Sequence, residues 1–126
     1  MHKALKANQA VALLTDQVPP EGLGVWVPFF GKPAYTMTLA ARLALQSGAA
    51  LLPVSCERLP HGAGYVLKIW PPVDGLKTDV MATVTSINKA LEMIVLSQPS
   101  QYLWGYARYK TPRHPTSEHA AAKEAS

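Results

Sequence analysis

Residues 17–35 carry four prolines and three glycines, and this punctuation constrains the fold more than any other part of the chain. Proline removes a backbone donor and breaks helices, and an interior glycine costs a helix about 1 kcal/mol. The apolar residues of the segment follow no sustained helical period, so we expect a long loop. Loops of this length are uncommon in compact domains unless they serve a function, which makes the segment a candidate site.

The run AVALLT, residues 10–15, precedes this loop and is typical of a buried strand. Asp16 stands at the end of the run, and Gln17 follows it. Ligand crevices of α/β sheets lie at the carboxyl ends of the strands, so Asp16 and Gln17 are candidate substrate-binding residues. The alternative is that Asp16 is a loop acid whose side chain caps a turn.

Regular elements alternate along the rest of the chain. A short helix is expected over residues 2–8. The segment TMTLAARLALQSG predicts a second helix, capped by Thr36 or Thr38 and stopped by Gly48. The runs AALLPVSCER and YVLKIW predict two strands, and LPHGAG between them has the residues of a turn.

The clearest helix lies within residues 77–99, where apolar residues step by four, three, four and three, at Val80, Val84, Ile87, Leu91 and Ile94. Thr78 or Asp79 can cap its start, and Pro99 follows its end. The resulting order is helix, strand, loop, helix, strand, strand, helix, which is an α/β pattern. A buried strand so close to Met1 lacks the neighbours that it needs, so we expect missing sequence upstream.

Composition suggests a surface that is partly meant to be covered. The chain has 126 residues, of which 48% are hydrophobic and only 16% charged, so we expect further protein or membrane to cover part of it. No signal peptide and no apolar run of about 20 residues is present, so membrane association should be peripheral. Cys56 is the only cysteine, which excludes an internal disulfide, and we expect it to be a buried structural thiol.

The net charge of +4 favours anionic partners such as phosphates and lipid head groups, although an ordinary basic surface would give the same value. Nothing matches a zinc-finger spacing, a basic helix or an RNA-binding aromatic motif. We therefore expect neither a metal nor a nucleic-acid partner.

Four blocks of the sequence are specific when they are taken together: AVALLTDQ, GVWVPFFGKPAYT, ARLALQSGAALLPV and PSQYLWGYARYK. They resemble the C-terminal half of the bacterial lipid A biosynthesis acyltransferases of the late lauroyl and myristoyl type, within the lysophospholipid acyltransferase family. The resemblance implies that residues 1–112 are the C-terminal part of a glycerolipid-acyltransferase-like domain, a mixed sheet flanked by helices with its N-terminal half missing. Residues 113–126 are expected to be a disordered polar tail.

By this resemblance, the whole protein transfers a fatty acyl chain from an acyl-carrier-protein or coenzyme A thioester to a hydroxyl of a lipid A precursor. This is a step of lipopolysaccharide biosynthesis, and the implied location is the cytoplasmic face of the bacterial inner membrane. No cofactor besides the acyl donor is implied.

In the family, the histidine of a His-x4-Asp/Glu motif deprotonates the hydroxyl, and it lies upstream of the block that resembles LLTDQ. In this chain only His119 and Glu124 have that spacing, and they lie in the polar tail, after every family block. We therefore expect a truncated chain that lacks its catalytic dyad and is inactive alone. The alternative is a non-catalytic lipid-binding or regulatory remnant of the same fold.

The resemblance also suggests substrate-binding residues. Phe29, Phe30 and Gly31 occupy the place where glycerolipid relatives carry a phosphate-binding Pro-Glu-Gly-Thr block. The two phenylalanines either form a wall of an acyl-chain groove or pack in the core, and Gly31 would allow close backbone approach. Lys32 could meet a phosphate, and Thr36 could offer its hydroxyl and a helix N-terminus to an anion.

Two arginines complete the candidate set. Arg42, the only charge in its helix, is either a surface arginine whose stem lies on apolar surface or a buried partner for an acid such as Asp16. Arg58 resembles the family's basic position after the PV strand and would lie near acceptor phosphates.

The segment QYLWGYARYK, residues 101–110, interleaves aromatic and basic residues. This pattern suits packing combined with a membrane interface, where aromatic rings sit at the level of the head groups. Family members commonly have a glutamate before QY and His-Arg-Arg after the tryptophan region. This chain departs from that pattern with Ser100, Tyr106 and Ala107.

Overall fold

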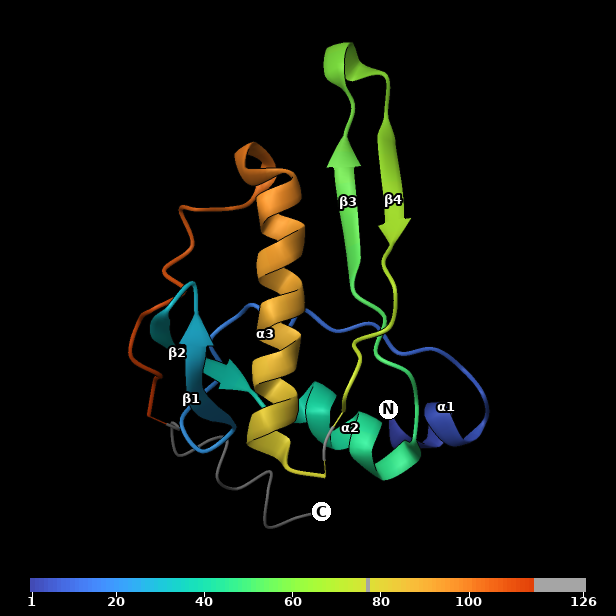
Figure 1. Cartoon of the computed structure of the whole chain (residues 1–126), viewed down its shortest axis with the longest axis vertical. Coiled ribbons are helices and arrows are strands. Elements are labelled where there is room, and N and C mark those ends of the chain that lie inside the picture. Colours follow the sequence, from blue (N-terminus) through green and yellow to red (C-terminus); the bar gives the residue numbers. More distant parts are fainter. Residues whose placement is uncertain (77, 115–126) are drawn as a thin grey trace.

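The computed structural model describes residues 1–76 and 78–114, which form a mixed α/β arrangement (Figure 1). The regular elements are α1 (His2–Lys6), β1 (Gly24–Phe29), β2 (Lys32–Met37), α2 (Leu39–Ser47), β3 (Val54–Arg58), β4 (Tyr65–Ile69) and α3 (Val80–Ser97). Single 3₁₀ turns lie at Pro60–Gly62 and Pro99–Gln101. In place of one mixed sheet, the described residues hold two separate antiparallel pairs, β1–β2 and β3–β4.

The loop expected over residues 17–35 is wrong in its second half, because this stretch forms the β1–β2 hairpin. Phe30 and Gly31 make its two-residue turn with φ values of 47° and 75°, the positive sign that matches the twist of such hairpins. The two strand prolines, Pro28 and Pro33, face each other in the register. They lie next to the closing pair of the turn, at a position that makes no ladder hydrogen bond, so neither needs the N–H that it lacks.

The strand expected over residues 10–15 is also wrong, since residues 9–14 have no regular secondary structure. Leu13 packs against the core, whereas the side chain of Leu14 is 69% exposed. A short apolar run does not by itself make a strand, and here it is an irregular segment whose Val11 and Leu13 lie beside Ala40 of α2. Asp16 therefore does not stand at the end of a strand.

The later elements agree with the sequence pattern. Thr38 is the N-cap residue of α2, and Gly48 ends the helix in the left-handed conformation with φ 70°. The carboxylate of Asp79 accepts a hydrogen bond of 2.7 Å from the N–H of Ala82 and caps α3. The predicted strand pair is present as the β3–β4 hairpin.

The core lies where α3 and α2 meet β1, and its buried members are Val27, Ala40, Ala41, Val84 and Ile87. Figure 1 shows α3 between the two hairpins, with β1–β2 on one side and β3–β4 extending away from the rest of the chain. Cys56 lies on β3 and is exposed, so the prediction of a buried thiol is wrong. The last residues of the expected tail, 115–126, with His119 and Glu124, lie outside the described residues.

Candidate functional site

A network of buried polar groups is built around Arg108, a charged side chain that is only 3% exposed. Its Nη1 donates to the carbonyl of Tyr35 at 3.0 Å, and its Nη2 donates to Oγ1 of Thr36 at 2.7 Å. Its guanidinium carbon lies 5.1 Å from the centroid of the Phe29 ring. The arginine thus joins the segment after α3 to both strands of the β1–β2 hairpin.

Thr36 is fully buried at the centre of this network. Its hydroxyl donates to the carbonyl of Ala34 at 3.1 Å and accepts from Arg108 and from Nδ2 of Asn88, the latter at 3.3 Å. Thr36 lies inside β2 rather than at the start of α2, and its hydroxyl is fully used. The expectation that it offers a hydroxyl and a helix N-terminus to an anion is therefore wrong.

Asn88 brings α3 into the same network. Its side chain is fully buried, and Nδ2 also donates to the carbonyl of Pro28 at 2.9 Å. Two buried atoms, Oδ1 of Asn88 and Nε of Arg108, have no hydrogen-bond partner among the described residues. We call Phe29, Thr36, Asn88, Tyr102 and Arg108 the Arg108 cluster.

Asp16 interacts electrostatically with two members of this cluster, Tyr102 and Arg108. The side chain is half-buried, and the loop after it is held by a hydrogen bond of 2.8 Å from the N–H of Val18 to the hydroxyl of Tyr106. Burial, followed by the charge of Asp16, raises the pKa of Tyr102, while Arg108 opposes that rise. Burial lowers the pKa of Arg108, and Tyr102 and Asp16 counteract it. Asp16, Tyr102 and Arg108 are thus electrostatically linked.

A cavity of about 240 Å³ opens beside the Arg108 cluster. Its lining is mostly aromatic with two cations: Phe29, Tyr102, Trp104, Tyr106, Ala107, Arg108, Tyr109 and Lys110. Tyr109 closes one side by donating its hydroxyl to the carbonyl of Phe29 at 2.7 Å. Apolar walls with a few polar groups suit a small amphipathic or anionic group. Across residues 1–76 and 78–114, no three His, Cys, Asp or Glu side chains gather as a metal would require.

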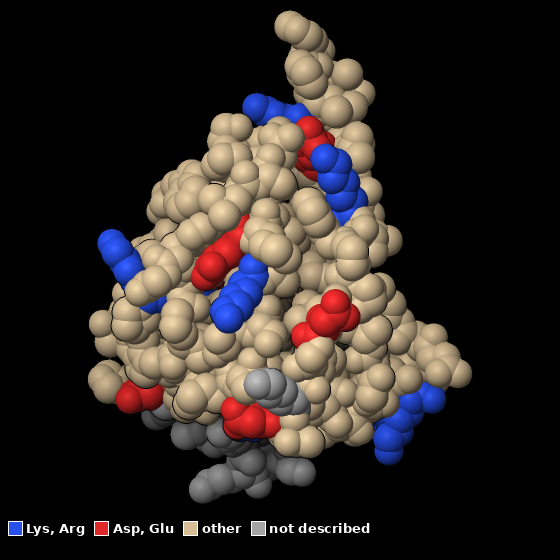
Figure 2. All heavy atoms as spheres, viewed as in Figure 1, with Lys and Arg blue, Asp and Glu red and all other residues tan. Residues whose placement is uncertain are grey.

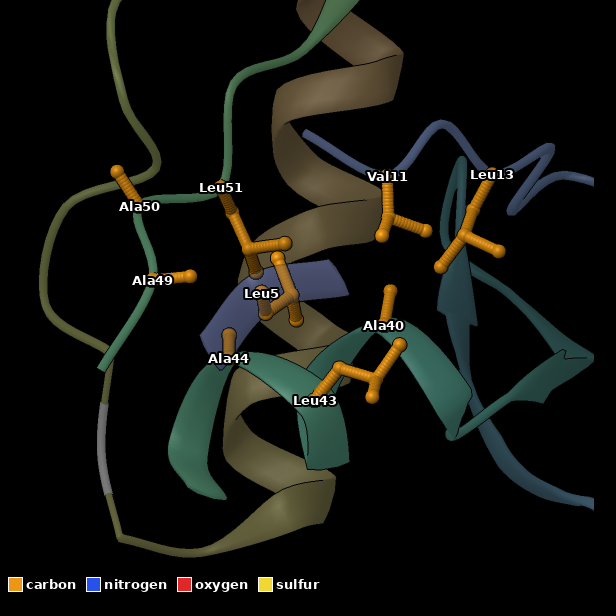
Figure 3. Close-up of a pocket in the computed structure, with 9 residues that line it drawn as sticks. All are labelled: Leu5, Val11, Leu13, Ala40, Leu43, Ala44, Ala49, Ala50 and Leu51. Atoms are coloured by element: carbon orange, nitrogen blue, oxygen red, sulfur yellow. The ribbon is translucent and has the colours of Figure 1, made fainter. Parts of the chain in front are cut away.

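A second cavity, about 50 Å³ in volume, is lined by apolar side chains (Figure 3). It lies between α1, α2 and the irregular segments around residues 11–13 and 49–51, and is lined by Leu5, Val11, Leu13, Ala40, Leu43, Ala44, Ala49, Ala50 and Leu51. The space is much smaller than the cavity beside the Arg108 cluster, and no polar side chain lines it.

The predicted site residues of the hairpin lie together at one end of the Arg108 cluster. Phe29 is 1% exposed and packs in the core while also lining the larger cavity, so it combines both alternatives. Phe30 is half-buried, lies 6.1 Å from Trp104 between ring centroids, and donates its N–H to Oε1 of Glu92 at 2.7 Å. Gly31 and Lys32 are exposed, at the turn and at the start of β2.

Three other predicted residues do not join the cluster. Gln17 is exposed, and Arg42 is exposed on α2, which supports the surface alternative and excludes a buried pair with Asp16. Arg58 is exposed on β3, where its backbone, rather than its guanidinium, is bound by Gln101. The structure therefore gives these side chains no shared binding geometry.

Reasoning from sequence missed the buried roles of Arg108 and Asn88. Arg108 stood among aromatic residues in a segment that we assigned to packing and a membrane interface, and its burial excludes it as an interfacial cation. The only available signal was its position in a block of alternating aromatic and polar residues. Asn88 could have been found as the single amide on the apolar face of α3, one residue after Ile87.

Charges elsewhere are sparse: on the face shown in Figure 2, the few cations and acids, some of them side by side, are separated by wide uncharged areas. Among the described helices, α3 alone is long and apolar enough to cross a membrane, by length and composition only. Its side chains Val84, Ile87 and Asn88 are buried against the rest of the fold, as in the core helix of a domain.

Comparison with known proteins gives a consistent match. The family model "Bacterial lipid A biosynthesis acyltransferase" matches residues 1–111. The chain is 36% identical over 113 residues to a lipid A biosynthesis lauroyltransferase of Escherichia coli K12, covering 88% of this chain and 37% of that protein. It is 35% identical over 109 residues to a palmitoleoyltransferase of the same bacterium, covering 86% and 36%. A phosphatidylinositol mannoside acyltransferase of Mycobacterium tuberculosis is 28% identical over 102 residues, covering 81% and 31%. The chain thus spans about a third of the length of each of these relatives.

Proposed function

This chain belongs to the bacterial lipid A biosynthesis acyltransferase family, and on that premise we propose that it works as the C-terminal part of an enzyme that acylates a lipid A precursor. The observation that carries the proposal is the match over residues 1–111, which includes every member of the Arg108 cluster and Asp16. The relatives of highest identity cited above are named for transfer of lauroyl and palmitoleoyl groups in lipid A biosynthesis.

The reaction joins the acyl carbon of a thioester to a hydroxyl oxygen of the acceptor. The C–S bond breaks, the hydroxyl proton passes to a base, and the thiol leaves with a proton. We propose that this base is a histidine of a His-x4-Asp/Glu motif outside residues 1–112, and that the donor is an acyl-carrier-protein or coenzyme A thioester. The 126-residue chain alone would then not transfer acyl groups.

The Arg108 cluster supports a positioning role in this proposal. Arg108, Asn88 and Tyr109 fix the β1–β2 hairpin with hydrogen bonds to the carbonyls of Tyr35, Pro28 and Phe29. Phe30, which is half-buried, then presents aromatic surface that suits an acyl chain, and Phe29 supports its ring from the core. Asp16 stands at the rim of the same cluster, where its charge can orient a hydroxyl or balance a cation.

The remaining features of the proposal follow from the family. Residues 1–112 would form the C-terminal part of a glycerolipid-acyltransferase-like domain, and residues 113–126 would be a tail. The protein would work as a peripheral protein at the cytoplasmic face of the inner membrane, where its lipid acceptor is found.

A chimera tests the proposal directly. The 113 matched residues of the E. coli lauroyltransferase are replaced by the matched residues of this chain, and transfer from an acyl-carrier-protein thioester to a lipid A precursor is followed by mass spectrometry. We expect transfer by the chimera and none by the 126-residue chain. A chimera that is folded by circular dichroism but inactive would refute the proposed function. Transfer by the isolated chain would refute the need for an outside base.

Two variants of the chimera test the role of Asp16. Asp16→Asn should lower the rate of transfer at least tenfold, because it removes the charge linked to Tyr102 and Arg108. Glu21→Gln is the matched control, since Glu21 is an exposed acid of the same loop whose carboxylate pairs with His114. Equal rates in the two variants would remove Asp16 from the site.

A further inference from the structure

The β3–β4 hairpin turns its apolar face toward solvent. In its register Val54 faces Ile69, Cys56 faces Leu67 and Arg58 faces Tyr65, so these side chains share one face, which we call the outer face. All are exposed, with Val54 at 50%, Leu67 and Ile69 at 66% and Tyr65 at 70%. An amphipathic hairpin in a complete domain buries such a face, so this one is arranged for a covering layer.

The opposite face of the hairpin is polar and is the one engaged with the rest of the chain. Glu57 pairs with Lys68 across the strands, and its Oε1 accepts from Nε2 of Gln98 at 3.0 Å, just past the end of α3. On the same face, Nε1 of Trp70 donates to Oγ of Ser55 at 2.9 Å. The described chain therefore satisfies the polar face and leaves the apolar one without a partner.

The backbone N–H and C=O groups of the outer-face residues point away from the partner strand of the hairpin. The N–H of Leu59 donates to Gly64 and the N–H of Trp70 donates to Pro53, each at 2.9 Å, which fixes the alternation of the ladder. Residues 54, 56 and 58 of β3 and 65, 67 and 69 of β4 thus direct their N–H and C=O groups to the two outer edges. Two-stranded hairpins are marginal alone, and open edges are templates for further strands.

One edge position already shows how a strand would bind. Gln101 uses its side-chain amide to accept from the N–H of Arg58 at 2.8 Å and to donate to its carbonyl at 3.1 Å. This pair of bonds copies what a neighbouring strand does at an antiparallel position. Among the described residues, no side chain bonds the outward backbone groups of residues 54 and 56 on the same edge in this way.

We propose that the outer face and open edges of the β3–β4 hairpin dock the part of a lipid A acyltransferase that has no counterpart in this chain. That part adds strands at the edges and covers the outer face. This inference rests on the proposed function. The length of the relative identifies the polypeptide that docks. The match contains the whole β3–β4 hairpin but covers only 37% of the lauroyltransferase, so nearly two thirds of that protein is left to cover the outer face.

The surface fits a polypeptide better than a bilayer. Lipid tails cannot bond the free N–H and C=O groups of an edge strand, and such edges do not occur within hydrocarbon. Arg58 is the one charge on the outer face, so anionic head groups find little to bind there. A strand bonds the edges and buries the apolar side chains at once.

Cys56 provides a native probe for the test, because it is the only cysteine of the chain and is exposed on the outer face. The full chain is co-expressed with the unmatched segment of the E. coli lauroyltransferase, and alkylation of Cys56 is timed by peptide mass spectrometry. We expect co-purification and at least a tenfold slower alkylation than in the chain alone. Leu67→Lys should abolish both effects, whereas Val66→Lys, on the opposite face of β4, should leave them in place.

Several results would overturn the docking surface. These are failure of the two polypeptides to co-purify, unchanged alkylation of Cys56 in their complex, or a complex that Leu67→Lys does not weaken. Slow alkylation in the chain alone would assign the face to a second copy, and slowing by phosphatidylglycerol vesicles would assign it to a membrane. A complex with protected Cys56 but no acyl transfer would refute only the proposed function, whereas transfer with accessible Cys56 would refute only the docking.

Discussion

Arg108→Met is the most informative single substitution, because this buried side chain makes two of the hydrogen bonds that hold the segment after α3 on the β1–β2 hairpin. The change removes the bonds of 3.0 Å to Tyr35 and 2.7 Å to Thr36. A hydrogen bond to a charged group contributes about 1.5–3 kcal/mol, so losing both costs about 3–6 kcal/mol. Part of this loss of stability is offset, because folding no longer has to desolvate a guanidinium and methionine keeps an apolar stem. We expect a net loss of about 2–4 kcal/mol in the free energy of unfolding.

Urea unfolding of the full chain measures this loss. With a slope of about 2 kcal/mol per molar urea, the middle of the range for small proteins, the midpoint should fall by roughly 1–2 M. Arg42→Met is the matched control, since Arg42 is exposed on α2 and its loss should change stability by less than about 0.5 kcal/mol. Arg108→Lys should fall between the two, because lysine keeps the charge but lacks the planar fork that reaches both acceptors. The reasoning is refuted if Arg108→Met is as stable as Arg42→Met.

Three further predictions concern the same region. Gly31→Ala should cost about 1–2 kcal/mol in urea unfolding, since its φ of 75° strains an L side chain although no atom lies within 4 Å of a Cβ; a neutral result would contradict the turn geometry. Asn88→Leu should cost about 1–3 kcal/mol, because it removes the donor to the partly buried carbonyl of Pro28 and to the buried hydroxyl of Thr36, and unchanged stability would show that the amide is dispensable. Burial and then Asp16 raise the pKa of Tyr102 above 10.0, so the folded state holds this proton longer, and stability should be complete below pH 10 and decline as the pH rises through the raised pKa. Asp16→Asn should move the Tyr102 titration, read by ultraviolet absorbance, to lower pH; an unmoved curve would exclude the coupling.

The sequence predicted the elements whose signals are local. The step of four and three in α3, the cap at Asp79 and the glycine stop at Gly48 all depend on neighbours within a few residues, and each is present. The strand pair around LPHGAG was visible for the same reason. These features follow from the backbone and from side-chain periodicity alone.

The β1–β2 hairpin was missed because its signals conflict. Four prolines argue against a strand, and the turn is Phe-Gly rather than the Asn-Gly or Asp-Gly that marks such hairpins. The register removes the conflict, because it places Pro28 opposite Pro33 at a pair that makes no ladder hydrogen bond. The register depends on how the two strands pair, and the local sequence does not show it. Phe30 accepts φ 47° there while its ring packs edge-on against Phe29 at 4.8 Å between centroids.

The Arg108 cluster could not be predicted because its bonds span long stretches of chain. Arg108 reaches Thr36 across 72 positions, and Asn88 reaches Pro28 across 60. The prediction for Cys56 was wrong for a different reason. The thiol was predicted to be buried because a free cysteine in an apolar run usually is, whereas it lies on the face of the β3–β4 hairpin that the fold leaves exposed.

Most polar side chains of the segment after α3 are bound within the fold, which reduces the surface that the segment can offer to a membrane. Arg108 points into the core, the hydroxyl of Tyr109 is bound to Phe29, and Lys110 lies 4.8 Å from the ring centroid of Tyr106. Leu103 and Trp104 keep most of their surface free, at 73% and 59% exposed, although Nε1 of Trp104 is anchored to the carbonyl of Pro99. An aromatic side chain with its polar atom satisfied and its ring exposed is suited to the head-group level of a bilayer. In the sequence, this segment interleaves aromatic and basic residues. In the structure, Leu103 and Trp104 form a short exposed apolar surface, and the rest of the segment mainly holds the β1–β2 hairpin in place.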